Sequence, residues 1–158
     1  MKKFLAIAFM LLTSVGIIHA NAAPLTIDVH VLNVEAIDQF RVNELIQADE
    51  KTAMETLLSA GATNGVFQAR LIGEEGREQP VRILKSIDGK VRGHAGAFIG
   101  VHRKDGVHLA YRFQEIGSSA HKFSARGEAI LQPRDALVTP FTDSDGVRSV
   151  LVISAKTN

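Results

Sequence analysis

The chain has 158 residues, with 18 Lys and Arg against 17 Asp and Glu and no cysteine. Without cysteine the protein can have no disulfide framework, no cysteine nucleophile and no lipid-modified cysteine as an anchor. The nearly balanced charge also argues against nucleic acid or an anionic membrane as a partner, because both attract proteins with a concentrated positive field.

The first 22 residues have the layout of a secretory signal peptide. Lys2 and Lys3 precede an apolar run from Phe4 to Ile18, which the small-residue segment Ala20-Asn21-Ala22 follows. A spanning helix needs more, roughly 20 apolar residues. We predict cleavage after Ala22; cleavage after Ala20 and retention of the segment as an N-terminal anchor are the alternatives.

Cleavage would remove two of the 18 basic residues and none of the 17 acidic ones, which leaves a nearly neutral chain. Residues 23–158 are then predicted to form one exported β-rich domain that folds without disulfides. The lysine-led signal and the lack of cysteine favour a bacterial periplasm as its location, with an extracellular location as the alternative.

The first predicted element after the signal is a half-buried strand over 25–31. Leu25, Ile27, Val29 and Val31 alternate there with polar residues. The stretch 36–47 can form either a loose helix, around Ile37, Phe40 and Ile46, or irregular structure, and the sequence leaves this open.

One helix is predicted between Asp49 and Gly61. Asp49 is a suitable N-cap, Glu50 lies in the first turn, and glycine ends the helix. The apolar residues Ala53, Met54, Leu57 and Leu58 recur at helical spacing, which predicts one face packed on the rest of the protein.

From Val66 onward the pattern predicts a series of strands divided by turns. The predicted strands cover 66–72, 81–87, 97–103, 107–113, 123–131, 137–141 and 148–154. The predicted turns are Glu75-Gly76, Asp88-Gly89, Asp105-Gly106, Arg134-Asp135 and Asp145-Gly146. The expected fold class is α+β, a mainly antiparallel β-sheet or sandwich with one or two packed helices.

The hairpin around Asp105-Gly106 admits two registers. A two-residue Asp-Gly loop sets Val101 opposite Ala110. A three-residue loop over 104–106 instead sets Val101 opposite Leu109 and places every apolar residue of both strands on one face, so we expect the second register.

This register would also place His102 directly opposite His108, within reach of one metal ion. Two imidazoles do not complete a zinc site, because a structural site needs four ligands and a catalytic site about three. The pair is therefore kept as a candidate metal site, and no cofactor is predicted. Two solvated histidines beside Arg103 and Arg112 are the simpler interpretation.

Two further polar segments were considered as sites. Asp143-Ser144-Asp145-Gly146 begins like a calcium loop, but no bidentate Glu follows, so a hairpin turn is favoured. Ser118, Ser119 and His121 share a polar stretch without an acid to orient the base. No nucleophile elbow or phosphate-binding loop is found either, so the sequence favours a non-catalytic protein, with no residue assigned to catalysis.

The C-terminal half resembles the β-rich domain of bacterial secretins, the outer-membrane channels of secretion and pilus systems. The likeness rests on the order of four segments over about 60 residues: Gly96–Val101, Asp105–Leu109, Gly127–Leu131 and Arg148–Ile153. The Gly-Gly-Leu turn and the proline-leucine-glycine segment of the family's membrane-reaching part are missing. The resemblance implies a secretin-like module that does not form a pore.

The sequence therefore predicts a non-catalytic periplasmic module that binds or assembles with another cell-envelope protein, possibly through an exposed strand edge. A small-ligand or metal-binding protein that uses the His102 and His108 face is the alternative. Neither nucleic acid nor stable membrane insertion after cleavage is expected, and the sequence leaves the oligomeric state open.

Overall fold

The computed structural model describes residues 24–87, 89–117 and 123–157, so the predicted signal peptide lies outside the described residues. In chain order the elements are β1 Pro24–Asn33, α1 Gln39–Glu44, the 3-10 helix η1 Leu45–Gln47, α2 Glu50–Ser59, β2 Thr63–Glu74, β3 Gln79–Ile87, β4 Lys90–Arg103, β5 Gly106–Ile116, β6 Ser124–Leu131, β7 Ala136–Thr142 and β8 Arg148–Thr157.

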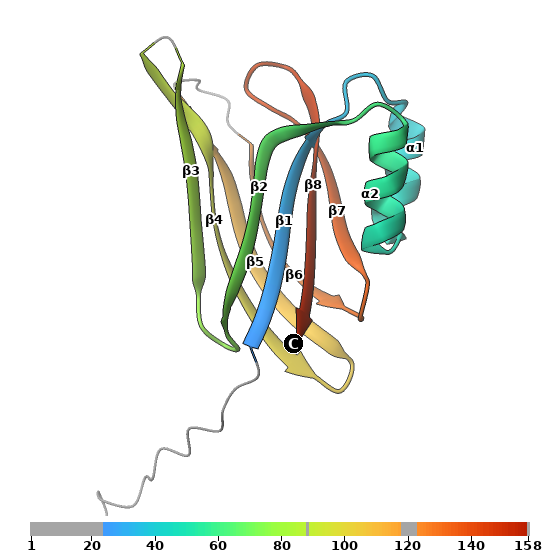
Figure 1. Ribbon diagram of the computed structural model, residues 1–158, viewed down its shortest axis with the longest axis vertical. Coiled ribbons are helices and arrows are strands. Elements are labelled where there is room, and N and C mark those ends of the chain that lie inside the picture. The colour runs from blue at the N-terminus through green and yellow to red at the C-terminus, as the bar shows by residue number, and fades with distance from the viewer. Residues whose placement is uncertain (1–23, 88, 118–122, 158) are drawn as a thin grey trace, which may run out of the picture.

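The strands form two four-stranded antiparallel sheets, with the orders β2-β1-β8-β7 and β3-β4-β5-β6. We call them the first and the second sheet. They lie face to face, and the helices lie on the side of the first sheet that faces away from the second sheet (Figure 1). The predicted class, a mainly antiparallel α+β sandwich with packed helices, is confirmed.

The main core lies between the two sheets. Alternate residues of β1 point into it, and the first sheet adds residues of β2 and β8 while the second adds residues of β4, β5 and β6. Its buried members are Leu25, Ile27, Val29, Val31, Phe67, Phe98, Val107, Leu109, Phe113, Leu131, Leu151, Ile153 and Ala155.

A second core lies between the first sheet and the helices. It joins the other face of β1, β7 and β8 to α1 and α2, and it includes Leu32, Val42, Leu57, Val138 and Val152. The helices therefore cover the part of the outer face that β1, β7 and β8 form, while Ile72 of β2 stays 67% exposed on that face.

The prediction that β1 is half-buried was wrong. Thr26 and Asp28, on the face away from the main core, are only 3% and 5% exposed. The carboxylate of Asp28 lies 2.6 Å from the Arg70 guanidinium and 3.8 Å from the Lys156 amine. These cations from the flanking strands allow a charged group to occupy a covered sheet face.

The predicted helix is confirmed as α2. The Asp49 carboxylate accepts hydrogen bonds from the Thr52 hydroxyl, at 2.6 Å, and from the Thr52 backbone N–H, at 3.0 Å, and these two bonds lower the pKa of Asp49. Ala53 and Leu57 are buried, but Leu58 is 39% exposed, so the packed face is narrower than predicted. The stretch that the sequence left open forms α1 and η1.

Every predicted strand is found, and β4 begins earlier than predicted. Its first half contains Gly93 and Gly96, residues that weaken a strand pattern. A Cβ at Gly93 would lie 2.0 Å from the Ile83 carbonyl oxygen, and one at Gly96 would lie 2.8 Å from the Phe98 ring. Glycine is needed here because neighbouring atoms occupy the space of a side chain.

The predicted register of the β4–β5 hairpin was wrong. Arg103 pairs with Gly106, so the loop consists of Lys104 and Asp105, and Val101 faces His108. Gly106 is the first residue of β5, and glycine is needed there because φ is 126° and a Cβ would lie 2.6 Å from the Leu131 carbonyl oxygen of β6. The shift places Ala97, Ile99 and Val101 of β4 on the face opposite to that of Leu109, Tyr111 and Phe113 of β5.

Candidate functional site

The outer face of the second sheet is the best candidate for a functional surface. No described helix or strand covers it, whereas α1 and α2 lie on the outer side of the first sheet (Figure 1). We call this surface the open face. Its residues are Pro80, Arg82 and Leu84 of β3, Ala95, Ala97, Ile99 and Val101 of β4, His108, Ala110, Arg112 and Gln114 of β5, and Ser124, Arg126, Glu128 and Ile130 of β6.

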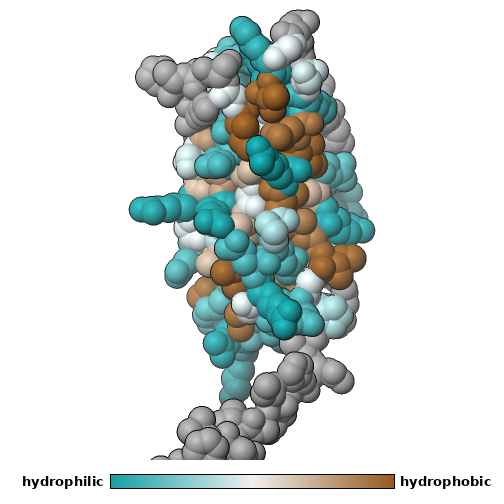
Figure 2. All heavy atoms as spheres, turned by 90° about the vertical axis from the view of Figure 1, so that its left-hand side faces the viewer, coloured by the Kyte–Doolittle hydropathy of each residue, from teal (hydrophilic) through white to brown (hydrophobic). Residues whose placement is uncertain are grey.

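An apolar stripe runs along β4 in the middle of the open face. The register sets Ala95, Ala97, Ile99 and Val101 outward, opposite the inward residues that include Phe98. Leu84 of β3 is 38% exposed and Ile130 of β6 is 52% exposed, so both edge strands also present apolar side chains. Figure 2 looks at the molecule from the side of β3 and shows apolar side chains interleaved with polar ones.

Arginines flank the apolar stripe. Arg112 of β5 lies directly opposite Arg126 of β6, an unfavourable pairing of like charges. The Arg112 guanidinium donates to the Glu78 carboxylate at 3.0 Å. Within the described part of the chain, neither Arg126 nor Arg82 has a recorded ion pair or hydrogen bond, so both have charge available for a partner.

The small side chains of the open face leave hollows between the larger ones. Two open hollows of about 440 and 370 Å³ share Ala97, Arg112 and Arg126 in their walls. The larger hollow also has Glu78 and Glu128 in its wall, whereas the smaller one has the two arginines and no acidic residue. The smaller hollow can therefore accept an apolar group that also carries a carboxylate.

The observed register separates the two histidines of the candidate metal site. His102 is opposite Val107 and lies on the core-facing side, whereas His108 is opposite Val101 on the open face. The His108 Nε2 lies 2.7 Å from the Asp105 carboxylate, and this hydrogen bond lowers the pKa of Asp105. Because the histidines lie on opposite faces, they do not form the predicted pair.

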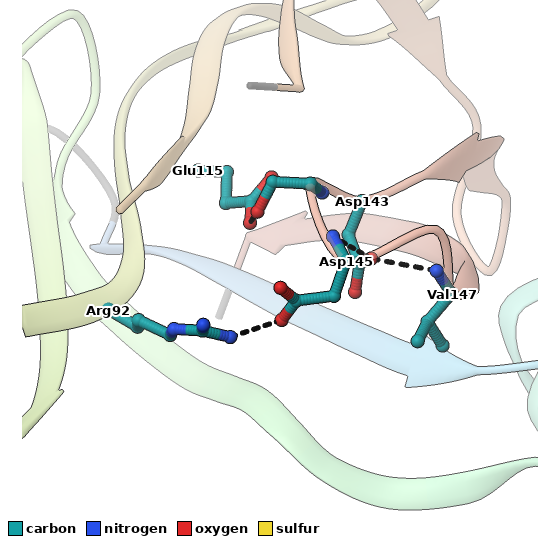
Figure 3. Close-up of polar contacts among 6 residues, drawn as sticks. Arg92, Glu115, Asp143, Asp145 and Val147 are labelled. Carbon is teal, nitrogen blue, oxygen red and sulfur yellow. Dashed lines mark hydrogen bonds and ion pairs between the residues drawn. The ribbon is translucent and has the colours of Figure 1, made fainter. Parts of the chain in front are cut away.

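The acidic loop after β7 is a hairpin turn, as predicted. The Asp143 carboxylate accepts hydrogen bonds from the backbone N–H groups of Asp145, at 2.9 Å, and Val147, at 2.8 Å (Figure 3). Gly146 has a φ of 83°, which suits glycine. Arg92 of β4 binds Asp145, so the turn is also tied to the second sheet.

A second carboxylate holds the same end of the sandwich together. Glu115 of β5 accepts hydrogen bonds from the Ser144 hydroxyl and from the Ser144 backbone N–H, the latter at 3.1 Å.

Among the described residues, no group of three or more His, Asp and Glu side chains is arranged to hold a metal ion. Ser118, Ser119 and His121, the other polar candidates, lie outside the described residues.

His94 is a buried titratable group that the sequence did not single out as a site. Its ring is 6% exposed, stacks on Phe113 at 5.4 Å between ring centroids, and meets Phe67 edge-on at 5.6 Å. Burial lowers the pKa of His94, while Glu115 and Asp143 oppose that shift. His94 faces the main core, so we assign it to packing rather than to the open face.

The open face was not found by sequence reasoning. The alternation of apolar residues around Ile99 indicates that one face of β4 is apolar. Which residues of β5 share that face depends on the hairpin register, and the predicted register was wrong.

Comparison with protein families, curated proteins and solved structures finds no match. In the described residues, no helix has the length and apolar character needed to cross a membrane.

Proposed function

We propose that the protein is a non-catalytic binding module that docks another protein of the cell envelope on the open face. The observation that carries the proposal is the unequal covering of the two sheets, because the open face keeps apolar side chains of β3, β4 and β6 in contact with solvent. An uncovered sheet face that exposes several apolar side chains is a candidate interaction site.

The charges of the open face indicate the chemistry of the partner. Arg82 and Arg126 have no acidic partner among the described residues, while Arg112 is held by Glu78. A protein segment with apolar residues beside one or two carboxylates would fill the hollows and complete the charge pairing. The surface favours a protein over a small ligand because its hollows are open and spread across several strands.

The location in the envelope is part of the same proposal. It rests on the predicted signal peptide and on the sequence resemblance of the C-terminal half to the secretin domain. In this view the protein is a secretin-like periplasmic module that contributes no pore of its own.

Site-specific photo-crosslinking in the native cell tests this proposal. A photoreactive amino acid placed at Ile99 lies in the centre of the open face, and we expect it to yield a discrete adduct with an envelope protein. The matched control is Ile72, which is 67% exposed on β2 of the first sheet and should yield no such adduct. Mass spectrometry identifies the second protein in each adduct.

A second variant tests the charge argument. Arg82→Glu should weaken the Ile99 adduct, because it opposes the partner's carboxylate without changing the core. Lys85→Glu on the same strand is the control and should leave the adduct unchanged. No adduct at Ile99, or equal adducts at Ile99 and Ile72, would contradict docking on the open face.

A further inference from the structure

The two sheets have four edge strands, β2, β7, β3 and β6. Three of them have a feature that hinders the addition of another strand. β3 contains Pro80 and β7 contains Pro140, which remove a backbone donor. The β1–β2 pairing has an irregularity between Val31 and Leu32. β6, with the sequence SARGEAIL, has neither proline nor lysine.

The hydrogen bonding of β6 defines which of its groups point away from the sheet. The Glu115 N–H of β5 donates to the Phe123 carbonyl oxygen at 2.9 Å, so residue 123 bonds toward β5. Bonding groups alternate along an antiparallel strand, so residues 125, 127, 129 and 131 also bond toward β5. The N–H and C=O groups of Ser124, Arg126, Glu128 and Ile130 therefore point to the free edge.

These four outward residues also have their side chains on the open face, since each lies opposite an open-face residue of β5. Among the described residues, neither their backbone groups nor the charged ends of Arg126 and Glu128 have a recorded partner. An added strand would thus find both unsatisfied backbone groups and two unpaired charges of opposite sign.

From this arrangement we infer that β6 pairs antiparallel with β6 of a second copy of this chain, with Gly127 on the twofold axis. This register sets Arg126 directly opposite Glu128 of the second copy, and Glu128 opposite its Arg126. The same register sets Ser124 opposite Ile130. In each of these pairs the backbone N–H and C=O groups of both residues point to the free edge, so the two residues exchange two backbone hydrogen bonds.

The charges select this occupant over an unrelated strand. The twofold register makes the edge self-complementary, because one sequence supplies both the cation and the anion. It also places a carboxylate beside Arg126, whose neighbour Arg112 is a like charge. The two open faces would then join into one continuous surface. The inference does not rest on the proposed docking partner, but it pairs Arg126 with the second copy, which leaves Arg82 for a carboxylate of that partner.

Charge reversal at the dimer interface is the main test. Sedimentation velocity of the purified protein over a concentration series should show a monomer–dimer equilibrium. Arg126→Glu alone and Glu128→Arg alone each place like charges opposite one another twice per dimer, and each should weaken association at least about tenfold. The double variant restores opposite charges and should recover association.

Arg82→Glu is the control, because it changes the same charge on the same face at the other edge strand. It should leave association unchanged. A protein that stays monomeric up to about 1 mM would overturn the inference. A dimer that is indifferent to both single reversals would overturn it as well. Circular dichroism and thermal unfolding verify that each variant is folded.

Cysteine pairing tests the register independently of charge. The chain has no cysteine, so Ser124→Cys combined with Ile130→Cys adds two symmetry-related candidate pairs across the interface, each at about 5.5 Å between Cα atoms, a distance that a disulfide can span. Mild oxidation should give a reducible dimer with the double variant and not with either single variant. Equal cross-linking of a single variant would refute this register.

Discussion

The two sheets of this protein share a core but differ in their outer surroundings. The first sheet has the main core on one face and the helices on the other, and Val150, Leu151, Val152 and Ile153 of β8 are all fully buried. The second sheet has the main core on one face only. Its strands alternate, with buried residues such as Phe98 and Phe113 inward and a mixture of small, charged and partly exposed apolar residues outward.

This difference separates the part of the protein that provides stability from the part available for binding. Burial on both faces gives β8 a continuous apolar sequence, while burial on one face gives β5 and β6 an alternating one. A substitution on the outer face of the second sheet should therefore affect binding with little effect on folding. Substitutions of neighbouring residues with opposite orientations test this separation.

The largest effect is expected for Phe98→Ala on the inner face of β4. Phe98 is fully buried in the main core, so its removal leaves a cavity and should lower the free energy of unfolding by about 3–5 kcal/mol. Ile99→Ala, one residue along on the open face, should cost less than about 1 kcal/mol. Urea unfolding measures both. Equal losses would contradict the assignment of the two faces.

The next effect concerns the helical cover of the first sheet. Leu57 of α2 is fully buried, and Leu57→Ala should destabilise the protein by about 2–3 kcal/mol, the lower part of the usual range because a surface helix can move to fill space. Leu58→Ala, at a 39% exposed neighbour, should change stability by less than about 1 kcal/mol. Thermal unfolding distinguishes them, and a larger loss for Leu58→Ala would mean that α2 packs through another face.

A smaller effect is expected where the two sheets approach closely. A Cβ at Gly100 would lie 2.2 Å from Cδ2 of Leu25, which is fully buried and has little freedom to move. Gly100→Ala should therefore destabilise the protein by about 1–3 kcal/mol. At Gly117 a Cβ would meet nothing within 4 Å, so Gly117→Ala is the matched control and should be nearly neutral. If Gly100→Ala were also neutral, the sheets would be less tightly packed than described.

The sequence predicted the elements whose signals are local. Asp49 capped α2 as expected, and the turn glycines at 76, 89 and 146 have positive φ values that mark the hairpins. Such signals depend on residues a few positions apart. The alternation of β1 likewise predicted its inward residues, because Leu25 to Val31 repeat with the period of a strand.

The errors came from contacts between distant segments. The half-buried prediction for β1 failed because the face of β1 away from the main core is also buried: Thr26 is 3% exposed there, and Asp28 is buried with help from Arg70 and Lys156. The hairpin register failed because Gly106, which has a φ of 126° and lies against the backbone of β6, pairs with Arg103 as the first residue of β5 instead of lying in the loop. A shift of one residue in pairing moves His102 and His108 to opposite faces, so the candidate site depended on a detail that tertiary contacts decide.

The last prediction concerns His94, where the effect is expected only as the pH falls. Burial lowers the pKa of His94 below its ordinary value of 6.5, so the unfolded chain binds this proton at a higher pH than the folded chain. The contribution to stability is therefore complete above about pH 6.5 and is lost progressively below it. His94→Phe retains an aromatic ring against Phe113 and removes the titration, so its unfolding midpoint should fall less steeply between pH 7 and pH 5 than that of the unsubstituted protein. Part of the slope should remain, since burial also lowers the pKa of His30.

His94→Gln should flatten the dependence of the unfolding midpoint on pH equally, but this variant should unfold more readily at pH 7, because it buries an amide among aromatic rings. An unchanged slope in both variants would show that His94 is not buried in its neutral form, and the end of the second sheet would then be as open to water as its outer face.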